Sequence, residues 1–177
     1  MKTGRQRWSD AMEFLDPQFK KNPRPFILQS LMALATFFIV LLFVEKVTQV
    51  VIVAALGAST FIVFSMPHTM TAAPRRLIGG HFMGLVSGSV CHFLFIDGLS
   101  VNLNQSTALL ALTFGVAIAL AMFLMAVTNT EHPPAAATSI GLLMAGWSWS
   151  AILFVLLFAG LLAIIHYALR RYLVNLF

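Results

Sequence analysis

The chain has 177 residues, of which 10% are charged and 59% are hydrophobic, and its mean hydropathy is +0.89. A soluble domain carries about 25% charged residues, so this composition excludes a soluble globular protein and predicts an integral membrane protein. The net charge of +5 does not indicate a nucleic-acid-binding protein, because six of the eleven basic residues precede Pro25 and the others lie at the ends of apolar runs. The single cysteine, Cys91, excludes an internal disulfide.

The first 25 residues combine mixed charges with Trp8, Met12, Leu15 and Phe19 at helical spacing. This pattern predicts an amphipathic helix on the cytoplasmic membrane surface, followed by a single transmembrane domain over residues 26–177. No short apolar core with a small-residue cleavage site follows the basic residues, so we expect no signal peptide.

Six uncharged runs follow this segment, and each predicts a membrane helix. Five of them approach or exceed the roughly 20 residues that cross about 30 Å of hydrocarbon, whereas the fifth in chain order is short. We therefore predict an all-α polytopic bundle of about six membrane segments. The runs are Phe26–Val44, Val47–Met66, Leu77–Ile96, Thr107–Asn129, Ala135–Ser150 and Ala151–Leu169.

The basic residues favour six crossings. With a cytoplasmic N-terminus, six crossings place ten of the eleven basic residues inside and leave only Lys46 outside. If the short run does not cross, Arg170 and Arg171 move outside and the ratio falls to eight against three. Because Lys and Arg concentrate in cytoplasmic loops, we expect six crossings with both termini cytoplasmic, in the inner (plasma) membrane of a bacterium. A 3+3 inverted repeat fits six spans, and four full spans with re-entrant segments are the alternative.

Glu131-His132-Pro133-Pro134 is the strongest candidate for a functional site. It lies between the fourth and fifth uncharged runs. Ionisable residues at membrane depth mark functional sites by default, and a helix break there persists only inside protein or beside a polar cavity. We predict that this motif lines the path of a transported solute. The structural alternative is that His132 caps a broken helix and Glu131 extends into cytoplasmic water.

The fifth run predicts an unusually short helix. Only about 13 to 15 residues separate Pro134 from the tryptophans at positions 147 and 149, which corresponds to about 20 Å of helix. If the tryptophans lie in the outer aromatic belt, the helix begins several ångströms inside the inner membrane boundary. We expect Asn129 or Thr130 to be its N-cap, and its free N–H groups to form a site for an anion or polar group.

Further residues complete the predicted path. Gly57 and Ser59 in the second run either line it or pack helices together. Arg75 and its neighbour Arg76 either anchor the third run at the lipid head groups or form a basic mouth that concentrates anions. The other candidates for the path are His68, in a polar loop expected to fold back against the bundle, together with His81 and Thr138.

The remaining histidines and glycines are interpreted structurally. His81 and His92 are 11 residues apart, about 16 Å along one helix face, so they cannot bind one metal ion together. His166 is expected at the membrane interface, near the end of the last run. A ridge formed by Gly80, Gly84 and Gly88 lets another helix approach closely, either within one protomer or at the seam of a homo-dimer.

An ordered set of short motifs resembles the HPP family of integral membrane proteins, named for its His-Pro-Pro motif. The matching residues are Gly57-Ala58-Ser59, Pro67, Ala73-Pro74-Arg75, Gly79-Gly80-His81, His132-Pro133-Pro134 and Ala137-Thr138. The resemblance covers most of the chain from about Phe26 to Leu169. It implies a transporter with four membrane spans, and plastid and cyanobacterial members are associated with nitrite.

This chain departs from the family pattern at three places. Ala73 stands where a Gln is expected, Ala136 where a Gly is expected, and His68-Thr69-Met70 follows Pro67 in place of Ser-Pro. If these residues contact the solute, its identity differs in this chain.

Transport of a small monovalent anion, such as nitrite, is the leading functional hypothesis, with membrane lipid and the anion as partners and with a homo-oligomer as an option. One alternative is a heme- or metal-binding membrane protein that uses intramembrane histidines, and another is an accessory or scaffold subunit. No nucleophile elbow, phosphate-binding loop, metalloprotease helix or thiol pair occurs. We therefore expect no enzyme activity, no catalytic residues and no cofactor.

Overall fold

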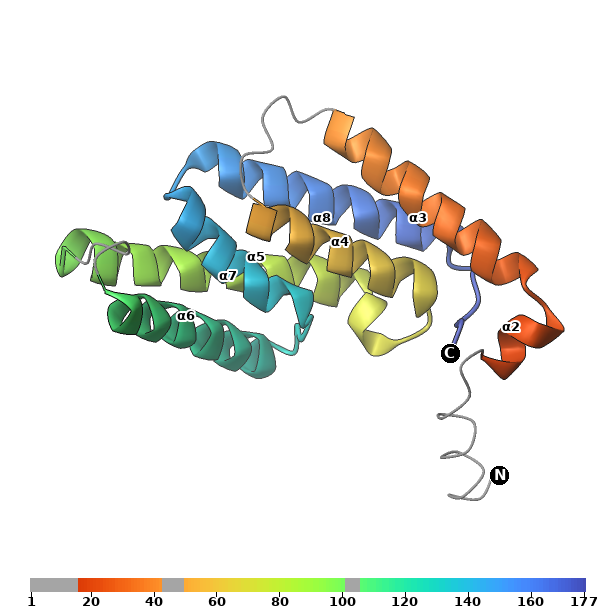
Figure 1. The fold of residues 1–177 in the computed structure, drawn as a ribbon, viewed down its shortest axis with the longest axis horizontal. Coiled ribbons are helices and arrows are strands. Elements are labelled where there is room, and N and C mark those ends of the chain that lie inside the picture. Colours follow the sequence, from red (N-terminus) through yellow and green to blue (C-terminus); the bar gives the residue numbers. More distant parts are fainter. Residues whose placement is uncertain (1–15, 43–49, 101–105) are drawn as a thin grey trace, which may run out of the picture.

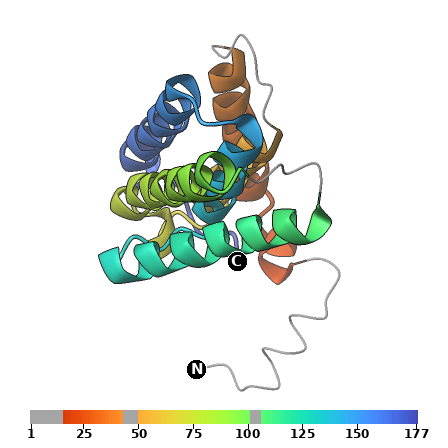
Figure 2. The same cartoon turned by 90° about the vertical axis from the view of Figure 1, so that its left-hand side faces the viewer.

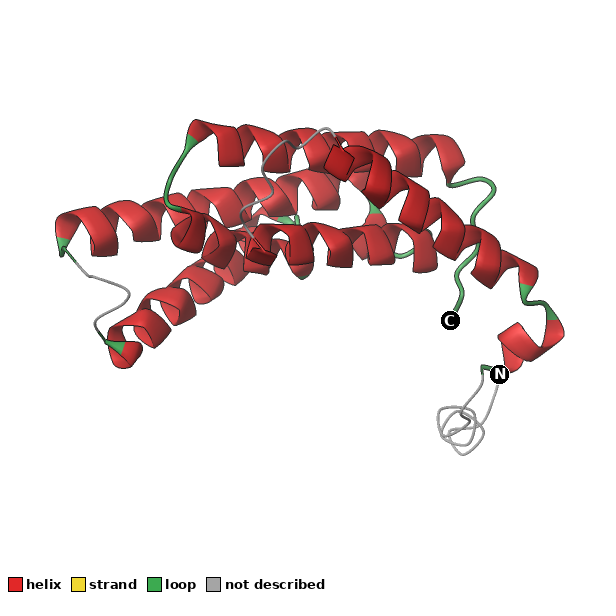
Figure 3. Cartoon of the chain, turned by 45° about the horizontal axis from the view of Figure 1, so that its top comes forward, coloured by secondary structure: helices red, strands yellow, loops and turns green. Residues whose placement is uncertain are grey.

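A computed structural model describes residues 16–42, 50–100 and 106–177. Within these residues the chain forms only helices and loops, as Figure 3 shows. The predicted all-α class is therefore confirmed. The helices are α2 (Pro17–Lys21), α3 (Arg24–Leu42), α4 (Val50–Ser65), the 3₁₀ turn η1 (Met70–Ala72), α5 (Pro74–Cys91), the π-helical turn η2 (His92–Gly98), α6 (Thr107–Thr128), α7 (Pro134–Ala145) and α8 (Trp149–Leu169).

Helices α3 to α8 correspond one for one to the six predicted runs. Three segments of the described chain are long and apolar enough to cross a membrane: Pro74–Gly98, Thr107–Thr128 and Trp149–Leu169. The other three helices are apolar but shorter. The molecule is therefore a polytopic helical membrane bundle.

The N-terminal segment is described from Asp16 onward. The Asp16 carboxylate caps α2 by accepting the Gln18 N–H at 2.6 Å. The ring of Phe19 packs against that of Phe26 at the start of α3, with 5.3 Å between their centroids. The rest of the predicted amphipathic helix, with Trp8, Met12 and Leu15, lies outside the described residues.

Helix α5 lies at the centre of the bundle and packs against α6, α7 and α8. In the end-on view of Figure 2 it runs through the middle, with α6 below it and α8 above it. The glycine ridge of α5 faces α7 and the residues just before it: a Cβ at Gly80 would lie 2.6 Å from the Cβ of His132, and one at Gly88 would lie 2.8 Å from the Ser139 carbonyl. The interpretation as packing within one protomer is confirmed.

Outside this centre the helices expose apolar side chains. Leu112, Met122, Phe123 and Val127 of α6 are all exposed, whereas the interior is filled by a cluster that includes Leu56, Phe64, Leu77, Leu142 and Phe158. An apolar exterior around an apolar core is the arrangement of a bundle whose solvent is lipid.

The start of α3 and the C-terminal tail meet at one end of the bundle, beside α2 (Figure 1). The buried amide of Gln29 accepts the Val174 N–H and donates to the Val174 carbonyl, both at 2.9 Å. It also donates to the carbonyl of Phe64, and the Leu176 N–H reaches the Ser65 carbonyl at 2.9 Å. These bonds join the two ends of the transmembrane domain on the same side of the bundle.

Candidate functional site

Helix α6 ends in a left-handed turn at Asn129, whose φ is 54°. The Asn129 N–H bonds the Ala126 carbonyl at 3.3 Å, and the Thr130 N–H bonds the Met125 carbonyl at 2.9 Å. This pair of bonds is the Schellman motif, whose left-handed residue is usually Gly and sometimes Asn. The prediction that Asn129 or Thr130 caps the following helix is wrong: Asn129 closes α6, and the Thr130 hydroxyl pairs with that of Thr128 at 2.7 Å.

Helix α7 begins at Pro134, with Pro133 as its N-cap residue and no side-chain cap. Both prolines lack an N–H, and the next two N–H groups are already bonded, Ala135 to the His132 carbonyl at 2.9 Å and Ala136 to the Pro133 carbonyl at 3.1 Å. The predicted anion site of free N–H groups at this helix start is therefore wrong. The prolines start the helix at no cost in hydrogen bonds, because those positions have no intrahelical acceptor.

The connection between α6 and α7 folds into the bundle. Thr128 and Asn129 lie beside the first turn of α5, where Arg75 donates to the Thr128 carbonyl at 3.3 Å. His132 packs instead on Gly80, five residues farther along α5 than Arg75, which corresponds to about 7.5 Å of helix rise. The connection thus runs inward along α5, and the start of the short helix inside the membrane boundary stays a prediction.

Arg76 holds the outer part of this connection. It donates to the Asn129 side chain at 2.6 Å and forms an ion pair with Glu131 at 2.7 Å. Arg75 and Arg76 thereby place positive charge at the C-terminal end of α6, where the helix dipole favours it. Among the contacts of the described residues, both arginines serve to fix this turn, and Glu131 points toward them.

Four polar side chains meet in the interior with almost none of their surface exposed: Ser59 of α4, His81 of α5, His132 of the connection and Thr138 of α7. Ser59 Oγ lies 2.9 Å from His81 Nε2 and 2.9 Å from His132 Nε2. His81 Nδ1 lies 2.8 Å from Thr138 Oγ1, and the two imidazole centroids are 5.4 Å apart. We call these four residues the histidine cluster.

The cluster extends by one bond to η1. His132 Nδ1 lies 2.9 Å from the backbone carbonyl of Thr71. All four side chains are among the path candidates predicted from the sequence, but the Thr71 carbonyl is not, because a backbone acceptor carries no residue-type signal. Five polar groups from five segments are thus linked in a row that apolar helices enclose.

The other predicted residues lie elsewhere. Gly57 faces Phe37 of α3, where an added Cβ would be 3.5 Å from the ring. His68 is exposed, and the loop that carries it does fold back: its N–H bonds the Asn175 side chain at 3.0 Å and its Nε2 lies 2.9 Å from the Leu173 carbonyl. His92 is at the other end of α5, 3.8 Å from Asp97.

The prediction for His166 is wrong. Its side chain is buried inside the protein, with Nε2 2.8 Å from the Pro67 carbonyl. A histidine near the end of an apolar run resembles an interfacial anchor in sequence, but here it holds the loop between α4 and η1.

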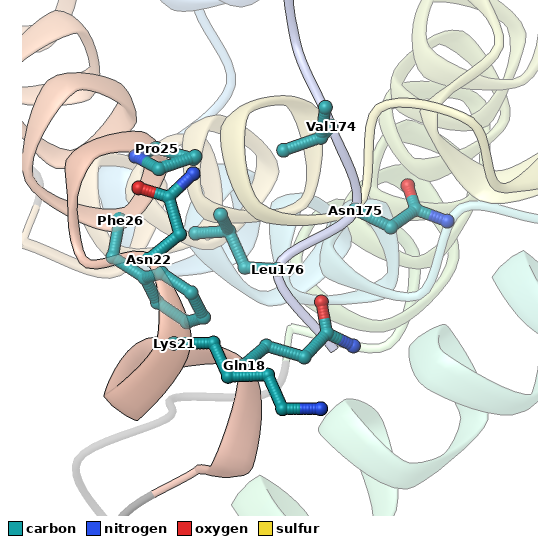
Figure 4. Close-up of a pocket in the computed structure, with 8 residues that line it drawn as sticks. All are labelled: Gln18, Lys21, Asn22, Pro25, Phe26, Val174, Asn175 and Leu176. Atoms are coloured by element: carbon teal, nitrogen blue, oxygen red, sulfur yellow. The ribbon is translucent and has the colours of Figure 1, made fainter.

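A cavity of about 380 Å³ lies away from the histidine cluster, between α2, the start of α3 and the C-terminal tail (Figure 4). Its lining combines amide and amine groups with apolar side chains: Gln18, Lys21, Asn22, Pro25, Phe26, Val174, Asn175 and Leu176. It contains none of the predicted path residues.

The described residues do not bring three metal-ligating side chains together. Within residues 16–42, 50–100 and 106–177, no group of three His, Cys, Asp or Glu side chains could hold a metal ion. His81 and His132 do approach each other, but all four of their ring nitrogens face hydroxyl or carbonyl oxygens.

Comparison with known proteins matches residues 18–175 to the family described as "HPP, transmembrane region". Two transmembrane proteins of Dictyostelium discoideum are also similar. One is 33% identical over 122 residues, which cover 67% of this chain and 40% of the relative. The other is 29% identical over 129 residues, which cover 71% of this chain and 39% of the relative. This chain therefore spans about two fifths of the length of these relatives, and no solved structure matches it.

Proposed function

This chain belongs to the HPP transmembrane family, and we propose that it carries a small solute across the membrane. The observation that supports this proposal best is the histidine cluster, a set of polar side chains buried among apolar helices at a helix break. Ionisable residues are rare inside membrane domains, and where they occur they mark solute or proton pathways.

A small monovalent anion such as nitrite is the proposed solute. The resemblance of the motifs to the family supports this choice, together with Arg75 and Arg76 on the outer side of the connection that leads to His132. Their positive charge would raise the local concentration of anions. The cluster is closed in this conformation, so solute passage requires α7 or the connection to move.

Six crossings with both termini cytoplasmic are the proposed topology. The positive-inside rule supports it, and so does the contact between Gln29 and Val174, which joins the first and last membrane segments at one end. On this proposal α7 is the short crossing. Any homo-oligomer would have to use a face other than the glycine ridge, because α7 covers that ridge.

Flux through purified protein in liposomes tests the function. Nitrite should enter protein-containing vesicles faster than empty ones, and the buried Ser87→Ala variant, which loses only the bond to the Ala117 carbonyl, should retain that flux. Absence of flux above background for nitrite, nitrate, formate and chloride would contradict transport. Absorption spectroscopy of the same sample checks the metal or heme alternative, which predicts a coloured or metal-containing protein.

A further inference from the structure

The Ser59 hydroxyl lies within hydrogen-bond distance of three groups but has a single hydrogen to donate. Its oxygen is 2.9 Å from His81 Nε2, 2.9 Å from His132 Nε2 and 3.0 Å from the Ala55 carbonyl. The Ala55 carbonyl can only accept, whereas each imidazole nitrogen either donates or accepts according to its protonation. The direction of the bond between Ser59 Oγ and His132 Nε2 therefore depends on where that hydrogen points.

The Thr71 carbonyl fixes the direction of the hydrogen bond at one end of the histidine cluster. Because that oxygen only accepts, His132 Nδ1 carries a hydrogen and donates it. If His132 is neutral, its Nε2 is bare and must accept the Ser59 hydrogen. Ser59 Oγ then accepts from His81 Nε2–H, and His81 Nδ1 accepts from the Thr138 hydroxyl. In the neutral cluster all bonds thus run one way, from Thr138 to Thr71.

A second set of hydrogen bonds can form in the histidine cluster without any heavy atom moving. If His132 takes up a proton on Nε2, both of its nitrogens donate, to the Thr71 carbonyl and to Ser59 Oγ. The Ser59 hydrogen then turns to the Ala55 carbonyl, while Ser59 Oγ still accepts from His81. Every group in the cluster keeps a partner in both states.

We propose that Ser59, His81 and His132 form a proton-carrying site that takes up a single proton at His132. When it does, the Ser59 hydroxyl hydrogen turns from His132 to the Ala55 carbonyl. The inference rests on the proposed transport function and makes the transport proton-coupled. A second proton would put two cationic rings 5.4 Å apart in apolar surroundings. An imidazolium at His132 would also supply the positive charge that an anion needs inside the bundle.

The surroundings assign the proton to His132 and not to Glu131. From α4 and α7 the cluster is faced by the hydroxyls of Ser59 and Thr138, from η1 by a carbonyl, and from α5 by His81. Within the described residues, the charged groups nearest in sequence are Arg76 and Glu131, and these pair with each other. Glu131 therefore serves as the ion-pair partner of Arg76, whereas His132 has a second ring nitrogen that can still take up a proton.

Nitrogen-15 NMR of histidine-labelled protein tests the site independently of transport. At neutral pH we expect His132 with hydrogen on Nδ1 and His81 with hydrogen on Nε2, the signals being assigned by removing one histidine at a time. On acidification His132 should become doubly protonated while His81 stays neutral. Hydrogen on His132 Nε2 at neutral pH, first protonation of His81, or no protonation of either ring within the pH range of the folded protein would overturn the proposal.

A dye that reports the internal pH of liposomes tests the coupling. Nitrate is a suitable probe, because its conjugate acid is too strong to carry protons through lipid by itself. Inward nitrate flux should acidify vesicles containing the wild type or Ser87→Ala, and Ser59→Ala should reduce this acidification about tenfold or more, as loss of a buried hydrogen bond implies. Wild-type flux of nitrate without acidification would overturn the proton site but leave transport standing. Correct tautomers without flux of any anion would overturn transport but leave the proton site standing.

Discussion

At the residue scale, the side chains of the connection between α6 and α7 make different kinds of contact. His132 points into the bundle and belongs to the histidine cluster, whereas its neighbour Glu131 points outward to Arg76. Thr130 packs on Gly79 and Asn129 turns the chain. Adjacent residues therefore have different roles: Asn129 turns the backbone, Glu131 forms an ion pair, and only the His132 imidazole brings a titratable group into the interior.

Glu131→Gln should change little. The Glu131 side chain is 44% exposed, so loss of its ion pair should lower the free energy of unfolding by no more than about 1 kcal/mol. Anion flux should stay within about twofold of the wild type, since a surface charge mainly changes encounter rates. Thermal unfolding and liposome flux of the purified variant measure both effects. A collapse of flux at normal stability would return Glu131 to the transport path.

At the element scale, close packing of α5 on α7 holds the cluster together. Gly84→Ala should destabilise the protein, because the new Cβ would collide with the backbone carbonyl of Ala135. Overpacking of this kind costs about 1–3 kcal/mol. Gly115→Ala is the matched control: that glycine is also in a membrane helix, α6, but an added Cβ meets nothing within 4 Å. Thermal unfolding should separate the two variants, and equal stability would show that the ridge is not a tight contact.

Replacing both Pro133 and Pro134 by Ala should impair transport more than folding. The alanines restore two N–H groups and remove the restriction on the preceding residues, so α6 and α7 can rearrange around the break. We expect flux to fall by about tenfold or more, while the yield of folded protein falls less. If yield and flux fall in parallel, the prolines serve folding alone.

The sequence predicts where the helices lie more accurately than it predicts where they end and which side chains meet. The six apolar runs became α3 to α8 because hydrophobicity dominates helix placement in a membrane protein. Asn129 was assigned to the wrong helix because Asn suits both an N-cap and a left-handed C-terminal turn. The meeting of Ser59, His81 and His132 depends on the rotation of three separate segments, which no local pattern fixes. The role of Gln29 could not be predicted from the sequence, because its partners are backbone groups of the distant C-terminal tail.

In the whole molecule, the start of the transmembrane domain and the C-terminal tail lie at the same end of the bundle. The C-terminal tail is bonded to α3 and α4 at the end of the bundle that also carries α2 (Figure 1). Of the described basic residues, Lys20, Lys21 and Arg24 precede or open α3 and the Arg170-Arg171 pair precedes the tail, so the proposed topology would place them toward the same membrane surface.

A reporter that is active only outside the cytoplasm, fused after Phe177 through a flexible linker, should remain silent. An even number of crossings from a cytoplasmic N-terminus returns the C-terminus to the cytoplasm. The same reporter placed between α5 and α6 should be active and serves as the control. A strong signal from the C-terminal fusion would require an odd number of crossings and a new position for α7.

If the buried imidazole of His132 belongs to the transport site, nitrite flux must depend on it, and the His132→Ala variant measures that dependence. This variant keeps both prolines, so it removes the chemistry of the motif without removing the helix break. We expect flux to fall by about tenfold or more relative to the wild type, at a folded yield and melting temperature close to those of Ser87→Ala. Wild-type flux from folded His132→Ala protein would show that this imidazole is not part of the transport site.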